Sequence, residues 1–136
     1  MRAEVTAAVP WAQIGAVAGG AAIGALLRWM AGVWLNGPAS RAIGFPLGTL
    51  LVNCAGGLMI GAALMVFERT PNEFYRLLVI TGFLGGLTTF SSFSVESLIM
   101  IQRGEWALAA GHTLAHVLGS LLFAAIGFGL ARAVID

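Results

Sequence analysis

The chain has 136 residues, of which 59% are hydrophobic and only 10% are charged, and its formal net charge is +1. A soluble domain carries about 25% charged residues, so this composition excludes a water-soluble globular protein and indicates a membrane protein. The small net charge argues against nucleic acid as a partner. With Cys54 as the single cysteine, the chain can form neither an internal disulfide nor a cysteine-based metal site.

Four apolar segments follow one another along the chain, and each is near or above the ~20 residues that a helix needs to cross a bilayer. We predict an all-α membrane protein, with a single transmembrane domain over residues 1–136 and spans at 11–35, 46–67, 76–101 and 106–132. The intervening segments are polar or turn-forming. The first apolar run is too long for the apolar region of a signal peptide, so we expect it to be retained as a span.

Arginine, the only basic residue type of the chain, is shared almost evenly between the two predicted sides of the membrane. One side carries Arg2, Arg69, Arg76 and Arg132, and the other carries Arg41 and Arg103, with Arg28 inside the membrane near that second side. The positive-inside rule normally produces a clearer difference. The count leaves two readings open: a single orientation with a weak signal, or insertion of the chain in both orientations.

Small and polar residues recur every four positions on one face of the second span, at Thr49, Asn53, Gly57 and Gly61. Glycines four apart allow helix backbones to approach closely, and the first span repeats this spacing in Gly15/Gly19 and Gly20/Gly24. The Asn53 carboxamide at mid-membrane depth requires either hydrogen-bond partners on another helix or a wet cavity.

The third span contains GFLGGLTTFSSFSVES (82–97), which is too rich in glycine and hydroxyl residues for a continuous apolar helix. Glycine is among the least favourable residues in a helix interior, so Gly82, Gly85 and Gly86 predict a break, where Thr88 and Thr89 offer hydroxyls to the released backbone groups. A break inside a membrane is tolerated only where it is buried in protein or faces a wet or ionic site. Freed carbonyls at such breaks commonly hold a cation.

Phe90 and Phe93 follow the predicted break and lie three residues apart on one helical face. The edge of a phenyl ring carries positive quadrupole charge and can face an anion, although such a pair more often packs in a core.

The fourth span carries His112, His116 and Ser120 at intervals of four residues. Histidines at this spacing can bind a metal, but no acidic residue lies between them, so a zinc site is not the favoured interpretation. Imidazole N–H and hydroxyl groups can donate to an anion. We therefore expect a polar track facing a cavity, with ordinary hydrogen bonds between helices as the alternative.

Three motifs in chain order together resemble the CrcB/Fluc fluoride channels: GALLRW (24–29), PLGTLLVN (46–53) and GGLTTFSSFSVE (85–96). The length and the four-span layout are also similar to that family, so the resemblance covers nearly the whole chain. It implies an antiparallel, dual-topology homodimer in the cell inner membrane, with a broken third helix and two pores between the subunits.

The resemblance also implies site residues. A structural sodium ion would be held by backbone carbonyls of Gly85 and Thr88, and Arg28 would lie in the vestibule. Glu96 would support the pore helix. The residues lining the pore and binding fluoride would be Asn53, Thr89, Phe90, Ser92, Phe93, His112, His116 and Ser120, although the match is looser at the two histidines.

The function that we predict is passive, fluoride-selective export from the cytoplasm, and not an enzymatic reaction. A small four-span multidrug exporter is one alternative, but the first span holds Arg28 where proton-coupled exporters of that kind rely on an acidic residue. The other alternative is a non-transporting membrane assembly subunit, which explains the small-residue packing but not the aligned polar residues.

Overall fold

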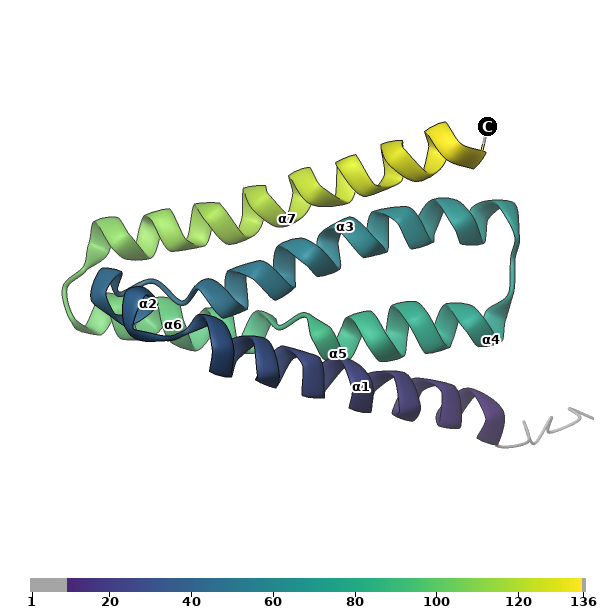
Figure 1. Ribbon diagram of the computed structural model, residues 1–136, viewed down its shortest axis with the longest axis horizontal. Helices are drawn as coiled ribbons and strands as arrows, with labels where there is room; N and C mark the ends of the chain where they lie inside the picture. Colours follow the sequence, from purple (N-terminus) through teal and green to yellow (C-terminus); the bar gives the residue numbers. More distant parts are fainter. Residues whose placement is uncertain (1–9, 136) are drawn as a thin grey trace, which may run out of the picture.

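In the computed structural model, which describes residues 10–135, the chain is helical and runs back and forth along one axis (Figure 1). Four helical segments are long and apolar enough to cross a membrane: Trp11–Leu35, Leu47–Arg69, Glu73–Gln102 and Trp106–Ile135. These four helical segments correspond to the four predicted spans, with their ends displaced by only a few residues. Their outer faces expose many aliphatic side chains, which suits a hydrocarbon environment.

The helices are α1 (Trp11–Leu35), α2 (Pro38–Ile43), α3 (Leu47–Arg69), α4 (Glu73–Arg76), the π-helix η1 (Leu77–Leu84), α5 (Gly85–Leu87), α6 (Phe90–Gln102) and α7 (Trp106–Ile135). The start of α1, the α3–α4 connection and the end of α7 lie at one end of the molecule, and α2 and the α6–α7 connection lie at the other (Figure 1). The short helix α2 was not predicted. Pro38 suits its first turn, and Gly44, with a φ of 66°, terminates it.

Aromatic and basic residues mark the two ends of the bundle. The exposed tryptophans lie near helix ends, as expected for side chains at the membrane–water interface: Trp11, Trp29, Trp34 and Trp106. The described arginines near the helix ends are divided between the two ends of the bundle, with Arg69, Arg76 and Arg132 at one and Arg41 and Arg103 at the other. Arg2, which the sequence count included, lies outside the described residues.

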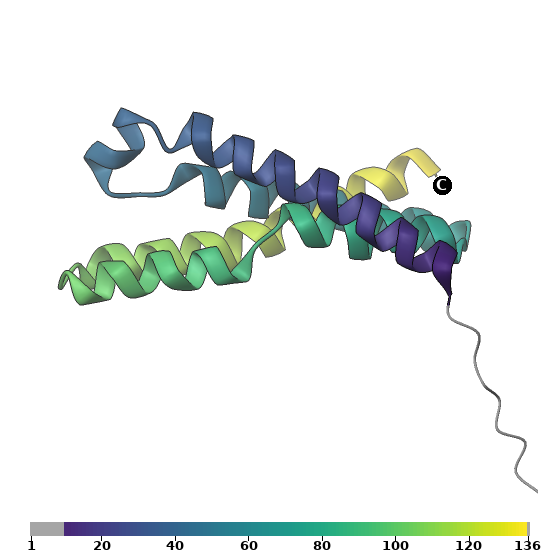
Figure 2. The same cartoon turned by 90° about the horizontal axis from the view of Figure 1, so that it is seen from below.

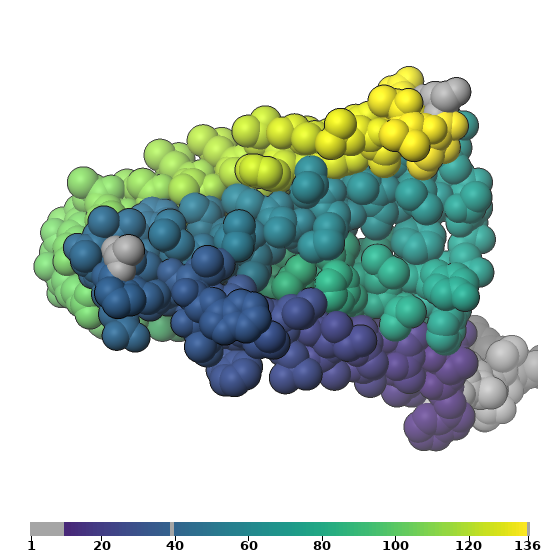
Figure 3. Space-filling view, viewed as in Figure 1, coloured from purple at the N-terminus to yellow at the C-terminus, as the bar shows by residue number. Residues whose placement is uncertain are grey.

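The helices α3 and α7 pack along their length through the predicted small-residue stripe. A methyl group added to Gly57 would lie 2.6 Å from the Ser120 carbonyl oxygen, and one added to Gly61 would lie 2.0 Å from that of Ala124. Only glycine leaves room for such close backbone contact. In the space-filling view, α3 lies between α1 and α7 (Figure 3).

The helix α1 packs against η1 and α5 in the same manner. A methyl group on Gly20 would lie 2.3 Å from the Leu78 carbonyl oxygen, and one on Gly24 would lie 2.1 Å from that of Phe83. The predicted close packing is therefore confirmed for Gly20/Gly24. Gly15/Gly19 do not pack in this way, because an added methyl at either glycine meets nothing within 4 Å in this chain.

The third span is interrupted between α5 and α6, where Figure 2 shows an extended connection between two coils. Thr88 (φ −82°, ψ 156°) and Thr89 (φ −151°, ψ 117°) have extended backbones. The predicted break is confirmed, but it lies at these threonines rather than at the glycines. Gly82 and Gly86 instead face α1, where added methyl groups would lie 2.7 Å from the Val17 oxygen and 2.5 Å from the Ala21 oxygen, respectively.

Candidate functional site

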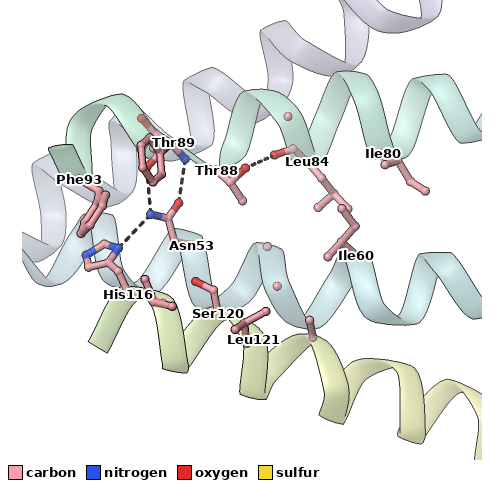
Figure 4. A pocket seen from close by; sticks show the side chains of 16 residues that line it. Asn53, Ile60, Ile80, Leu84, Thr88, Thr89, Phe93, His116, Ser120 and Leu121 are labelled. Carbon is pink, nitrogen blue, oxygen red and sulfur yellow. Dashed lines mark hydrogen bonds between the residues drawn. The ribbon is translucent and has the colours of Figure 1, made fainter. Parts of the chain in front are cut away.

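The break in the third span is held open by one side chain from α3. Asn53 Oδ1 accepts a hydrogen bond from the Thr89 backbone N–H at 2.8 Å, and Asn53 Nδ2 donates to the Thr89 carbonyl at 3.0 Å. The carboxamide thus provides hydrogen-bond partners for both the N–H and the carbonyl of Thr89, an extended residue that is not paired with a β-strand. Asn53 has the partners on another helix that its depth in the membrane requires (Figure 4).

The same carboxamide determines the tautomer of His116 on α7. Its Nδ2 lies 3.1 Å from His116 Nδ1, and this amide nitrogen is already oriented as a donor by its pairing with Thr89. His116 Nδ1 therefore accepts, and the imidazole proton is carried by Nε2. Both amide hydrogens of Asn53 donate within the chain. In this conformation the group with a hydrogen left to donate to a ligand is therefore His116 Nε2 and not the Asn53 amide.

The break releases carbonyl groups that a continuous helix would use. In a regular helix the Thr89 N–H would donate to the Gly85 carbonyl, but here it donates to Asn53. The Ser92 N–H would likewise donate to the Thr88 carbonyl, but it donates to Thr89 Oγ1 at 3.1 Å and caps α6. Thr88 Oγ1 donates to the Leu84 carbonyl at 2.9 Å. The Thr89 hydroxyl thus serves a released backbone group as predicted, whereas the Thr88 hydroxyl bonds a carbonyl that already accepts from the Thr88 N–H. The carbonyls of Gly85 and Thr88 lose their helical donors.

A cavity of ≈ 540 Å³ extends from the break along α3 and α7 (Figure 4). It is mainly apolar, and its polar lining residues include Asn53, Thr88, Thr89, His116 and Ser120. His116 and Ser120 of the predicted α7 track and Asn53 of the predicted α3 face therefore line one space, whereas His112 and Thr49 do not line it.

The two phenylalanines at the start of α6 line this cavity but differ in exposure. Their ring centroids lie 5.3 Å apart, and Phe93 is 8% exposed whereas Phe90 is 77% exposed. Phe93 also contacts the imidazoles of His112 and His116, with centroid separations of 5.4 Å and 4.8 Å. Phe93 is part of a buried aromatic stack, and Phe90 lies at the surface of the single chain.

Beyond Phe93, a polar cluster joins α3, α6 and α7. Thr49 Oγ1 donates to Glu96 Oε1, and Glu96 Oε2 lies 3.3 Å from His112 Nε2. His112 Nδ1 lies 2.9 Å from the Ser97 hydroxyl. Both histidines are buried, with exposures of 0% for His112 and 4% for His116. The bond from Thr49 ties Glu96 of α6 to α3. That Glu96 supports a pore helix stays a prediction.

A second cavity, of ≈ 360 Å³, lies on the other side of this cluster and is lined by Arg28, Thr49, Thr89, Ser92 and Glu96 among others. Arg28 Nε donates to the Gly86 carbonyl at 3.0 Å, so the guanidinium is tied to the end of α5 beside the break. Arg28 is half-buried and is not a freely snorkelling side chain. A formal positive charge therefore lies at the mouth of this cavity, while the lining of the first cavity carries none.

All but one of the site residues predicted from the sequence line one of these two cavities. The exception is His112, which was expected to line the pore but is fully buried and lines neither cavity. Two partners of these residues had no assigned role: Thr49, which holds Glu96, and Ser97, which bonds His112. Thr49 shares the four-residue spacing of Asn53 and could have been assigned from it. Ser97 could not, because its partner lies on a helix whose rotation the sequence does not specify.

A family model described as CrcB-like protein, camphor resistance (CrcB), matches residues 15–128 of the chain. The chain belongs to the CrcB family. Curated CrcB relatives named fluoride-specific ion channel FluC include that of Bordetella petrii, 50% identical over 88% of this chain and 91% of the relative. Those of Pseudomonas aeruginosa (50% identity; 86% of this chain, 91% of the relative) and Aromatoleum aromaticum (52%; 83% and 86%) are similar.

The CrcB match includes the break, Asn53, both histidines and Arg28, so it covers all the elements that build the two cavities. The CrcB relatives are named as ion channels, which places the chain in a family of channels rather than enzymes. Together with its four apolar helices, the match identifies a multi-pass membrane protein.

Replacing Asn53 tests the role of the carboxamide in holding the break. We expect Asn53→Ala to lower the free energy of unfolding by about 1–3 kcal/mol, because two buried backbone groups of Thr89 lose their partner. We also expect faster hydrogen–deuterium exchange over residues 84–92. The control is Asn36→Ala, which removes a side-chain bond to the Gly48 N–H and leaves both bonds to Thr89 in place. Unchanged exchange over residues 84–92 in Asn53→Ala would show that the break does not depend on this side chain.

Proposed function

We propose that this chain is the subunit of a fluoride-selective channel that exports fluoride from the cytoplasm across the cell inner membrane by passive flux. The observation that carries the proposal is the buried Nε2–H of His116, a donor without a hydrogen-bond partner among the described residues. It lies beside the Phe93 ring, in a passage that also offers hydroxyl groups. The relatives named fluoride-specific ion channels support the same ion.

Fluoride is small and strongly hydrated, so a pore must replace its water with several donors of moderate strength. An ion held by strong fixed cations would not leave, because conduction requires binding that is weak enough for release. The Ser92 and Ser120 hydroxyls, His116 and the ring edges of Phe90 and Phe93 supply such donors without a formal positive charge. Arg28 would concentrate anions at the entrance, while Asn53 and Glu96 position the pore residues.

Two copies in opposite orientations would complete the pathway. Phe90, whose ring belongs to the proposed passage, is 77% exposed in the single chain, and the cavity beside it is open to the outside. A second, inverted copy could cover this opening and create two equivalent pores at the interface. The small difference in the number of arginines between the two sides, four against two with Arg28 near the second, favours insertion in both orientations.

A structural sodium ion at the break belongs to the same proposal. The carbonyl oxygens of Gly85 and Thr88 would be its ligands, since their helical donors are engaged by Asn53 and Thr89. Hard cations prefer oxygen ligands of this kind, and a cation there would compensate carbonyl dipoles that face the membrane interior.

The two other functions considered from the sequence receive less support. A proton-coupled multidrug exporter would need a membrane-embedded acid in the first span, where α1 has Arg28. A non-transporting assembly subunit does not require the convergence of polar residues from three helices on one passage.

Replacement of the aromatic rings tests the proposed pore. We expect Phe90→Ile and Phe93→Ile dimers to elute normally on size exclusion but to release fluoride from liposomes about tenfold more slowly or worse. The reason is that loss of ~1.4 kcal/mol of ring-edge stabilisation changes a rate tenfold. Phe74→Ile, in α4 and outside both cavities, is the matched control and should keep wild-type flux. Wild-type flux through both folded pore variants would exclude the aromatic-edge mechanism. Chloride release by the wild type would exclude selectivity.

Labelling from the two sides of the membrane tests dual topology. In a Cys54→Ala background, we expect Arg103→Cys to react in part from each side with a membrane-impermeant thiol reagent. Asn72→Cys, at the opposite end of the bundle, should show the same mixed accessibility. Reaction of each position from one side only, and from opposite sides for the two positions, would establish a single orientation.

Exchange of the monovalent cation tests the sodium site. We expect fluoride flux to fall when sodium is replaced by a bulky organic cation during purification and assay, and to recover when sodium is restored. A heavier cation substitute should give an anomalous scattering peak next to Gly85 and Thr88. Full flux without sodium, together with no peak at the break, would exclude the ion.

A further inference from the structure

Three buried ligand atoms from two helices converge beyond Phe93. One ligand atom each of Glu96, His112 and His116 lies within 4.8 Å of the other two. His112 Nε2 and Glu96 Oε2 are 3.3 Å apart. Glu96 Oε2, His112 Nε2 and His116 Nε2 are all buried without a hydrogen-bond partner among the described residues. His112 Nε2 and Glu96 Oε2 have only their ion-pair contact with each other, and His116 Nε2 has no partner among the described residues, an arrangement that is costly for buried polar atoms.

The opposite ends of these side chains are each held by another residue. His112 Nδ1 bonds the Ser97 hydroxyl, and Glu96 Oε1 accepts from Thr49. The Ser97 hydroxyl can accept from Nδ1–H or donate to Nδ1 of His112. In the tautomer with the proton on Nδ1, His112 would present a lone pair on Nε2, as metal binding requires. Supporting bonds of this kind orient the first ligands of metal centres. The cluster therefore has the outer contacts of a metal site as well as the ligand atoms.

Two imidazoles and one carboxylate are a ligand set for zinc or a neighbouring borderline divalent ion. Bonds of ~2.0–2.1 Å in a tetrahedral site place ligand atoms roughly 3.3 Å apart, which is the separation that His112 and Glu96 already have. The sequence argument against zinc considered α7 alone, where no acid accompanies the histidines. The structure supplies the acid from α6.

Binding a metal would change the hydrogen bonding of His116. Its proton now resides on Nε2, because Nδ1 accepts from Asn53. To present a lone pair on Nε2, the ring must move this proton to Nδ1, which then cannot accept from the Asn53 amide. Coordination would therefore detach His116 from Asn53, the residue that holds the Thr89 backbone.

The position of the cluster makes it reachable by a metal ion and places that ion where it would affect conduction. Glu96 lines the cavity that contains Arg28, and His116 lines the larger cavity beside the break. An ion bound between them would lie in the proposed pathway and would remove the His116 donor that fluoride needs.

We propose that Glu96, His112 and His116 form a binding site for a borderline divalent transition metal, with Zn²⁺ as its representative, and that the filled site blocks conduction. The site itself stands on its own geometry, whereas the block rests on the proposed fluoride flux.

Metal binding is measured first, without reference to transport. Purified dimer freed of any affinity tag is titrated with Co²⁺, whose visible d–d absorption reports tetrahedral coordination, and Zn²⁺ is then added as a competitor. We expect about one Co²⁺ per chain, displaced by Zn²⁺. Glu96→Gln and His116→Gln should weaken binding by at least about tenfold, and Thr113→Ala, on the exposed face of α7, should not. Absence of the absorption, or affinities unchanged by the first two substitutions, would overturn the site.

A second variant protects the test against misfolding. Ser97→Ala keeps all three ligands and removes only the bond to His112 Nδ1, so we expect a folded protein with metal affinity lowered by about 10–100-fold. If this variant and the two ligand variants all bind Co²⁺ as the wild type does, the metal is bound elsewhere and the proposal is wrong.

Fluoride efflux from liposomes then tests the block. We expect Zn²⁺ on both sides to stop wild-type efflux, a chelator to restore it, and Ser97→Ala to raise the inhibitory concentration by the factor measured for binding. Efflux that persists in the metal-loaded protein would overturn the block. A wild type that releases no fluoride even without metal would instead refute the proposed function, while the Co²⁺ titration would still decide the site.

Discussion

The organisation of this membrane protein depends on the pairing of one carboxamide with one backbone residue. Asn53 reaches from α3 to both the N–H and the carbonyl of Thr89 and replaces the partners that an unbroken helix would have provided. Without these bonds, two backbone groups would be left unsatisfied inside the bilayer, where water is not at hand to replace the lost partner. The interruption of the third span is therefore part of the interior packing and not a local weakness of that helix.

The pairing also links functional groups that are distant in sequence. Because Thr89 holds the amide in one orientation, the remaining amide hydrogen of Asn53 is directed to His116 and fixes where its imidazole proton resides. Because Thr89 is extended, its hydroxyl can cap the start of α6. This helix carries Phe93 and Glu96, which contact the histidines of α7. The Asn53–Thr89 pairing thus influences the backbone geometry of the break, the placement of Phe93 and the tautomer of His116.

Much of this could be predicted from the sequence, for physical reasons that differ between features. The four spans follow from the length and composition of the apolar runs, and the contact of Gly57 and Gly61 with α7 follows from their spacing. The exact place of the break did not follow, because glycine content indicates where a helix is weak but not where another helix supplies a replacement partner. The approach of Glu96 to His112 depends on how α6 and α7 are rotated about their axes, and no local pattern records that rotation.

The π-helical stretch η1 has a consequence for insertions and deletions in this chain. Its wide turns place Leu78 and Phe83, five residues apart, against the same glycine of α1. The removal of one residue from 77–84 would allow ordinary α-helical turns, with no loss of hydrophobicity. It would also rotate everything downstream by about 100°, so that Thr88 and Thr89 would turn away from Asn53. Substitutions within η1 can leave the Asn53–Thr89 pairing in place, but the number of residues in η1 determines which way the break faces.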